Sequence, residues 1–191
     1  MDDAARLTTD RDAPAGERDE ELALAARVDP AAFGVLYDRH RLAVFRYLRM
    51  RASNEDQAAE LTAVTFERAM SAIPRYRPTG GGFLAWLLRI ARNAAIDAGR
   101  RVSAVPLDAN VPDERLGSVP EDSVLERETR ATLAAAIDRL PHIQRDAIVL
   151  RYGARLTARE IGLVLGKTDQ AAQKLISRAL ETIRESYRVD S

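Results

Sequence analysis

LTAREIGLVLGKTDQAAQKLISRALETI, residues 156–183, is the strongest local fold signal in the chain. Thr157 and Glu160 have the spacing of a capping box, in which side chains satisfy free backbone amides at a helix start. Gly166 is placed to end that helix in the left-handed conformation, and Thr168 can cap the next one. Two helices joined by a tight turn with glycine are typical of a helix-turn-helix.

The last helix, expected over residues 169–187, is amphipathic. Its apolar face comprises Ala172, Leu175, Ile176, Ala179 and Ile183, and its polar face comprises Gln170, Lys174, Ser177, Arg178 and Glu181. Gln and Lys side chains on such a helix can read base edges in the major groove of DNA. The alternative is a three-helix bundle whose polar face is simply solvated.

A second signal lies upstream, where the loop RYRPTGGG (75–82) precedes the helical stretch FLAWLLRIARNAAIDAGRR (83–101). On a helical projection the apolar residues gather on one face, and a polar stripe lies opposite with Trp86 at its edge. Arginines beside aromatic rings suit single-stranded or distorted nucleic acid, because bases stack on rings while cations hold phosphates. The alternative is that Tyr76 and Trp86 are packing residues. The polar stripe comprises Arg89, Arg92, Asn93 and Arg100.

The remaining pattern is also helical, which predicts an all-α fold. Asp29 and Pro30 have the form of a helix start, and Ser53 with Asp56 resembles a capping box for a helix from about 54 to 72. Pro74 ends that helix. Further helices are expected over residues 30–50, 122–139 and 142–152.

Charge divides the chain into parts, although the formal net charge is zero. Residues 1–29 carry −5, 30–101 carry +6, 102–123 carry −4 and 124–191 carry +3. We therefore expect two small helical domains joined by a flexible acidic linker. The expected parts are a disordered acidic tail (1–18), a first domain (19–101), a linker with three prolines (102–122) and a second domain (123–191).

Composition excludes several classes of function. The 191 residues include no cysteine and two histidines, which removes disulfides and leaves almost no material for a metal site or a catalytic triad. His40, between two arginines, is expected at the surface.

The stretch from Gly162 to Thr168 resembles a nucleotide-binding P-loop, but three residues separate its glycines where four are needed. We expect no enzyme, cofactor or small-molecule substrate, and a cytoplasmic protein without membrane insertion, because no apolar run is long enough and the N-terminus is acidic.

Three stretches, in this order, resemble the extracytoplasmic-function (ECF) group of the bacterial sigma-70 family of RNA polymerase sigma factors. AAFGVLYDRHRLAVFRYLRMR (31–51) is similar to the start of sigma region 2, and FLAWLLRIARNAAIDAGRR (83–101) to its end. LPHIQRDAIVLRYGARLTAREIGLVLG (140–166) resembles region 4, with its Leu-Pro, Arg-Asp and Leu-Arg-Tyr steps before a helix that opens in Glu-Ile. The resemblance covers about residues 29–187.

The resemblance implies a dissociable subunit that directs core RNA polymerase to promoters. Region 2 would bind the clamp of the largest core subunit and recognise and open the −10 element. Region 4 would read the −35 element near the polymerase flap, and an anti-sigma factor would hold the free protein. By position, the −10 residues would be Arg75, Tyr76, Arg77, Trp86, Arg89, Arg92, Asn93 and Arg100. The −35 residues would be Thr157, Arg159, Thr168, Gln170, Gln173, Lys174, Ser177 and Arg178, and the core-binding residues Glu60, Leu61, Thr65 and Phe66.

Two stretches depart from the family pattern. In AAELTAVTF (58–66), Ala63 and Val64 stand where Gln and Glu are usual. In the recognition helix, residues 171–175 read AAQKL where Thr-Val-Lys-Ser-Arg is usual, and this predicts altered promoter preference. A sigma-like, stand-alone DNA-binding regulator with weakened core binding is therefore the alternative. A further hypothesis is that the acidic tail folds onto a basic face and inhibits DNA binding.

Overall fold

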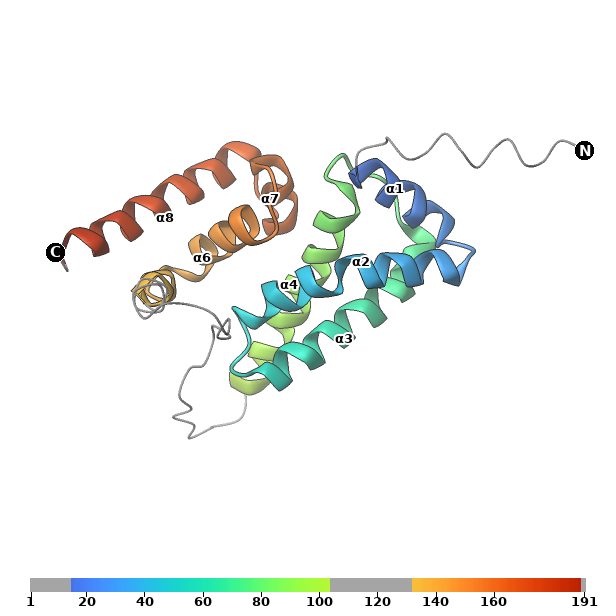
Figure 1. The fold of residues 1–191 in the computed structure, drawn as a ribbon, viewed down its shortest axis with the longest axis horizontal. Helices are drawn as coiled ribbons and strands as arrows, with labels where there is room; N and C mark the ends of the chain where they lie inside the picture. The colour runs from blue at the N-terminus through green and yellow to red at the C-terminus, as the bar shows by residue number, and fades with distance from the viewer. Residues whose placement is uncertain (1–14, 104–131, 190–191) are drawn as a thin grey trace, which may run out of the picture.

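The computed structural model describes residues 15–103 and 132–189, and within these ranges every regular element is a helix. The predicted all-α class is confirmed. The first half of the chain contains α1 (Ala15–Ala25), α2 (Pro30–Arg49), α3 (Glu55–Ala72), the short 3₁₀ helix η1 (Ile73–Arg75) and α4 (Gly82–Ser103). Figure 1 shows α2 and α3 running alongside each other, with α1 over one end and α4 packed against all three. The side chains of Leu36, Tyr47, Leu48, Phe83, Leu87 and Leu88 fill the core between them.

The second half begins with helical residues 132–138 and continues with α6 (His142–Ile148), the π-helix η2 (Val149–Gly153), α7 (Ala158–Leu165) and α8 (Asp169–Val189). The helix expected over 142–152 thus changes from α to π after Ile148. Of the helix expected over 122–139, residues 122–131 lie outside the described residues. The same holds for linker residues 104–122, while residues 102 and 103 extend α4.

Helix capping follows the sequence at most ends. The Asp29 side chain accepts a hydrogen bond from the Ala31 amide at 2.8 Å, with Pro30 at the first helical position. The Ser53–Asp56 capping box is wrong: the N-cap of α3 is Asn54, which accepts from the Gln57 amide at 2.8 Å. The second hydrogen bond of the cap also differs from the expected one. The acceptor for the Ser53 amide is the side chain of Gln57, at 2.7 Å, and not that of Asp56.

Helix α1 begins at Ala15, within the stretch 1–18 that was expected to be a disordered tail. Residues 1–14 lie outside the described residues. The helix is held by the Asp19 carboxylate, which is buried and pairs with Arg39 and His40 of α2. His40 is therefore buried, contrary to the surface position expected for it, because its charged sequence neighbours turn outward while its ring meets α1.

The two halves contact each other directly. Helix α7 packs on α4, and η2 packs on α2, as Figure 1 shows for the α4 side. The surfaces predicted for DNA binding lie on α4 and on α7 and α8, so this contact bears on the site described next.

Candidate nucleic-acid and polymerase interfaces

The helix-turn-helix forms as the sequence predicts. The capping box of α7 is present, with the Glu160 amide donating to Thr157 Oγ1 at 3.3 Å and the Thr157 amide donating to Glu160 Oε2 at 2.6 Å. Gly166 ends α7 with a φ of 66°, and Thr168 Oγ1 accepts from the Ala171 amide at 3.2 Å. A Cβ at Gly162 would lie 2.7 Å from the Lys167 carbonyl oxygen, so glycine permits the tight turn there.

The residues predicted to read the −35 element all lie at the surface of this motif. On α8, Ala172, Ile176, Ala179 and Ile183 are buried, which leaves the opposite face free. A helix supported along one face and polar along the other is the geometry that enters a major groove. The exposed residues are Thr157, Arg159, Thr168, Gln170, Gln173, Lys174, Ser177 and Arg178.

The residues predicted to contact the −10 element divide into an exposed polar set and an aromatic cluster. Arg75, Arg77, Arg89, Asn93 and Arg100 are exposed, and Arg92 is half-buried. Tyr76, Phe83 and Trp86 instead pack together, with ring centroids 5.1 Å apart for Tyr76–Trp86 and 5.3 Å for Phe83–Trp86. Trp86 is half-buried at the edge of this cluster, while Tyr76 is only 2% exposed.

Tyr76 is therefore a packing residue in this arrangement, as the alternative interpretation of the sequence had it. Burial, followed by the nearby charges of Glu20 and Asp19, raises the pKa of Tyr76 to about 12. Its ring cannot accept a stacked base without leaving the core. Trp86 is the aromatic side chain of this set that reaches the surface.

The four residues assigned to core binding do not share one surface. Leu61, Thr65 and Phe66 point into the protein, where Thr65 Oγ1 donates to the Leu61 carbonyl at 2.7 Å. Phe66 meets Tyr37 edge-to-face at 4.7 Å between ring centroids. Only Glu60 of the four is exposed. These buried residues fix α3 against α2 and α4, and they set which other residues of α3 face outward.

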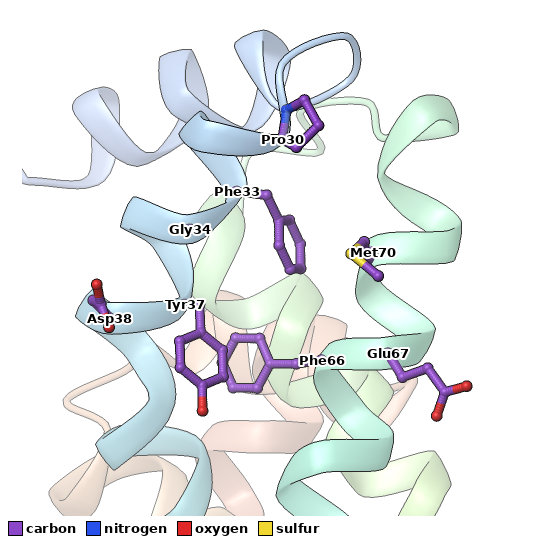
Figure 2. Close-up of a pocket in the computed structure, with 8 residues that line it drawn as sticks. All are labelled: Pro30, Phe33, Gly34, Tyr37, Asp38, Phe66, Glu67 and Met70. Carbon is purple, nitrogen blue, oxygen red and sulfur yellow. The ribbon is translucent and has the colours of Figure 1, made fainter.

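The outward face of α3 contains residues that the sequence interpretation missed. Glu67 and Met70 are exposed, and so is Ala63, one of the two departures from the family pattern. Figure 2 shows Glu67 and Met70 bordering a groove between α2 and α3. The groove has a volume of about 390 Å³ and is lined by Pro30, Phe33, Gly34, Tyr37, Asp38, Phe66, Glu67 and Met70. The floor of the groove is apolar, and the acidic residues Asp38 and Glu67 lie at its rim. Helical spacing from Glu60 along α3 could have identified Glu67.

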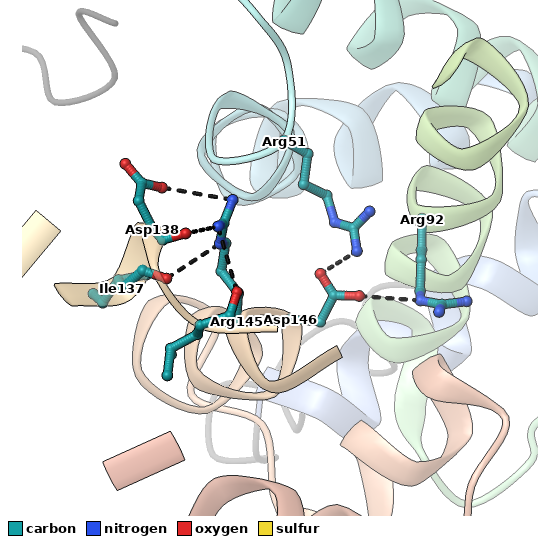
Figure 3. Close-up of polar contacts among 7 residues, drawn as sticks. Arg51, Arg92, Ile137, Asp138, Arg145 and Asp146 are labelled. Carbon is teal, nitrogen blue, oxygen red and sulfur yellow. Dashed lines mark hydrogen bonds and ion pairs between the residues drawn. The ribbon is translucent and has the colours of Figure 1, made fainter. Parts of the chain in front are cut away.

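An ion-pair cluster joins the two halves. The Asp146 carboxylate, on α6, pairs with Arg51 and with Arg92, whose Nε lies 3.3 Å from Oδ2 (Figure 3). A separate group in Figure 3 ties residues 132–138 to α6, because Arg145 Nε donates to the Ile137 carbonyl at 3.2 Å and pairs with Asp138. Sequence reasoning missed the pairing of Asp146, because its partners lie more than fifty residues away along the chain.

No group of three or more metal-ligating side chains occurs within residues 15–103 and 132–189. Among the helices that the structure describes, none is both long and apolar enough to cross a membrane.

Two family models match the chain, in the order that the resemblance requires. Sigma-70 region 2 matches residues 36–104, and Sigma-70, region 4 matches residues 130–183. The ECF RNA polymerase sigma factor ShbA of Streptomyces griseus subsp. griseus is 32% identical over 87% of this chain and 96% of its own length. The ECF RNA polymerase sigma factor BldN of Streptomyces coelicolor is 36% identical over 85% of this chain, which spans 62% of the length of BldN. The chain therefore belongs to the sigma-70 family of RNA polymerase sigma factors, within its ECF group.

Two solved structures have the same fold. CnrH, solved in complex with the cytosolic domain of CnrY, matches with a TM-score of 0.68 and 26% identity, over 91% of this chain and 99% of CnrH. The sigma factor RpoE of Bartonella quintana, solved in complex with the anti-sigma factor NepR, matches with a TM-score of 0.66 and 19% identity, over 83% of this chain and 98% of RpoE. The second likeness concerns the fold alone.

Proposed function

We propose that this chain directs core RNA polymerase to a set of promoters, reading the −10 element with α4 and the loop before it and the −35 element with α8. The observation that carries the proposal is the exposed polar face of α8 within a fully formed helix-turn-helix. The family membership supplies the polymerase as partner. The chain adds no catalysis of its own in this proposal, and it acts in the cytoplasm, where the polymerase is.

Promoter opening would use the exposed cations around α4. Arg75, Arg77, Arg89 and Arg100 can hold phosphates of a separated strand, and Asn93 can hydrogen-bond to it. Trp86 is the ring available for stacking. Tyr76 would contribute indirectly, because its packing against Trp86 holds that ring and the start of α4 in position.

Core binding would use the outward face of α3, which keeps Glu60 of the four residues first assigned, and the groove that Phe66 helps to line. Glu60, Glu67 and Met70 lie at the surface, and the groove beside them can receive an apolar side chain. Carboxylates at its rim favour a basic partner surface. Ala63 removes one polar contact from this face but leaves the carboxylates and the groove, so productive core binding is retained in this proposal.

An anti-sigma factor is the third proposed partner. One of the two solved structures of the same fold is a complex with a protein named as an anti-sigma factor. In this proposal such a partner covers the core-binding or DNA-binding faces of the free chain.

Run-off transcription with purified core polymerase tests the main proposal. Genomic fragments containing candidate promoters would be transcribed with and without the chain, and its addition should produce transcripts that start at defined sites. Sequences upstream of those sites would show what the altered recognition helix reads. Absence of defined starts, together with DNA binding by the free chain, would overturn the proposal and favour the stand-alone regulator.

A second assay isolates the core-binding step. Pull-down of core polymerase by the tagged chain should succeed, and Glu67→Lys should weaken it. A chain that binds promoter DNA but never retains core polymerase would point to the same alternative, which Ala63 and Val64 motivate.

A further inference from the structure

The turn between η2 and α7 contains a strained residue. Arg155 has a φ of 57° and is, among the described residues, the only one other than glycine with a positive φ. Glycine adopts this left-handed conformation freely because it lacks a Cβ, whereas arginine adopts it rarely. Strained residues of this kind gather at active and binding sites, so position 155 is a candidate for a functional role.

The turn itself requires the left-handed conformation at position 155. The Ala154 amide donates to the Val149 carbonyl at 3.2 Å. The buried Leu156 donates its amide to the Leu150 carbonyl at 3.1 Å. These bonds close the end of η2 in the manner of a Schellman cap, in which the residue before the last donor is left-handed. The fold therefore explains the φ at position 155, but it does not explain why arginine occupies that position instead of glycine.

The Arg155 side chain makes no polar contact that would hold the turn. It is exposed, and it forms no ion pair or side-chain hydrogen bond within residues 15–103 and 132–189. Its neighbour Arg151, by contrast, spans the turn and donates from Nη1 to the Leu156 carbonyl at 3.0 Å. Arg155 is therefore a free cation at a strained position, and its charge is available to a ligand.

The position of Arg155 suits a phosphate of duplex DNA. Arg155 lies two residues before Thr157, the N-cap of α7. In a helix-turn-helix the helix before the recognition helix crosses the DNA backbone, and helix N-termini are common phosphate contacts. Residues 151–159 contain three arginines and no acidic residue. The carboxylate that follows, Glu160, is engaged in the capping box, where it accepts from the Thr157 amide at 2.6 Å.

We propose that Arg155 binds a backbone phosphate at the edge of the −35 element, and that this contact fixes how α8 enters the major groove. The inference rests on the proposed function for the identity of the DNA. Arginine suits this role because its planar guanidinium can donate two hydrogen bonds to one phosphate. The contact carries no sequence information of its own, but it sets the register in which the exposed face of α8 meets base edges.

The variant Arg155→Gly separates the strain from the contact, because it relieves the first and removes the second. It should unfold at the same urea concentration as the wild-type chain or at a higher one, since glycine is the residue that the turn favours. Its affinity for duplex DNA should fall about tenfold, equally on a scrambled sequence and on a fragment from a promoter found by run-off transcription. The salt slope of the affinity should fall by about one, because one phosphate contact is lost.

Two further variants and a control make the test specific. Arg155→Lys keeps the charge, so it should keep the salt slope and recover part of the affinity. Arg155→Asn tolerates the left-handed conformation without a charge and should lose as much affinity as Arg155→Gly, so it tests the contact even if glycine loosens the turn. Arg139→Ala, at an exposed position after helical residues 132–138, makes the same charge change and should leave the affinity within about twofold.

Equal affinity and equal salt slope for the wild-type chain, Arg155→Gly and Arg155→Asn would overturn the inference. A loss confined to one duplex sequence would also overturn it, because Arg155 would then read a base. Run-off transcription separates these outcomes from the proposed function. If Arg155→Gly weakens duplex binding but neither chain starts transcripts, the phosphate contact stands and the sigma role falls. If both chains start equal amounts of transcript at limiting concentration and bind duplex equally, the inference alone falls.

Discussion

Nε2 of His40 lies 2.8 Å from Oδ2 of Asp19, and both side chains are buried where α1 meets α2. The ring of His40 also lies 5.6 Å from that of Phe83 at the start of α4. One hydrogen bond thus connects α1, through the ring of His40, to the aromatic cluster at the start of α4. The helix that carries Asp19 is in this way part of the support of the surface proposed to contact the −10 element.

Replacing Asp19 by Asn should destabilise the chain in a pH-dependent way. Burial alone would raise the pKa of Asp19, but hydrogen bonds and charges from His40 and Arg39 hold it below the usual 3.8. Because the folded-state pKa is lowered, the stabilisation is present above pH 3.8 and disappears as the pH falls through the folded-state value. Urea unfolding should show a loss of about 1.5–3 kcal/mol at pH 7 and a smaller difference near pH 3. A difference that does not change with pH would contradict this origin.

Two variants of Tyr76 distinguish a role in packing from a role in base stacking. Its hydroxyl is buried and makes no hydrogen bond within the described part of the chain, so Tyr76→Phe should leave the unfolding free energy within about 1 kcal/mol and promoter opening unchanged. Tyr76→Ala leaves a cavity beside Trp86 and should cost about 3–5 kcal/mol. Denaturant unfolding and permanganate footprinting of the opened promoter measure the two effects. Loss of opening with full stability in Tyr76→Phe would show that the hydroxyl meets DNA.

The sequence predicted the helices and their ends well where a local signal exists. The capping box at Thr157, the left-handed Gly166 and the Asp29–Pro30 start all form, because each depends on residues within one helical turn. Helix α1 was not predicted, and its first residues fall in the stretch 1–18 that was expected to be a disordered tail. Its anchoring residue, Asp19, finds its partners twenty residues away on α2, and no local pattern encodes that pairing.

The surfaces were harder to predict than the helices. A family pattern names positions without saying which way they face, so Leu61, Thr65 and Phe66 were assigned to core binding although they are buried. The exposed residues of the same helix, such as Glu67, follow from its packing on α2 and α4. The pairing of Asp146 with Arg51 and Arg92 depends on how the two halves meet, which the sequence between them does not specify.

The rim of the groove between α2 and α3 should determine core binding. Glu67→Lys reverses a rim carboxylate and should lower affinity for core polymerase about tenfold, and Met70→Ala should lower it less, because it removes only apolar contact. Glu21→Lys, at an exposed position on α1, is the control with the same charge change. Fluorescence anisotropy with labelled chain measures all three. An equal loss in Glu21→Lys would indicate long-range electrostatics instead of this groove.

The variant Lys174→Ala shows whether this side chain of α8 contacts a DNA phosphate or reads a base. The side chain is exposed on the polar face of α8, within the stretch 171–175 that departs from the family pattern. If it holds a phosphate, Lys174→Ala should weaken binding to all duplexes uniformly and lower the salt slope of the affinity by about one. If it reads a base, the loss should be about 1–3 kcal/mol and confined to the preferred −35 sequence. Titration of the variant against matched and scrambled duplexes at several salt concentrations separates the two, with Arg184→Ala as the control on the same helix. An affinity that does not change on either duplex would remove Lys174 from the interface and displace the reading face of α8 toward Gln170 and Gln173.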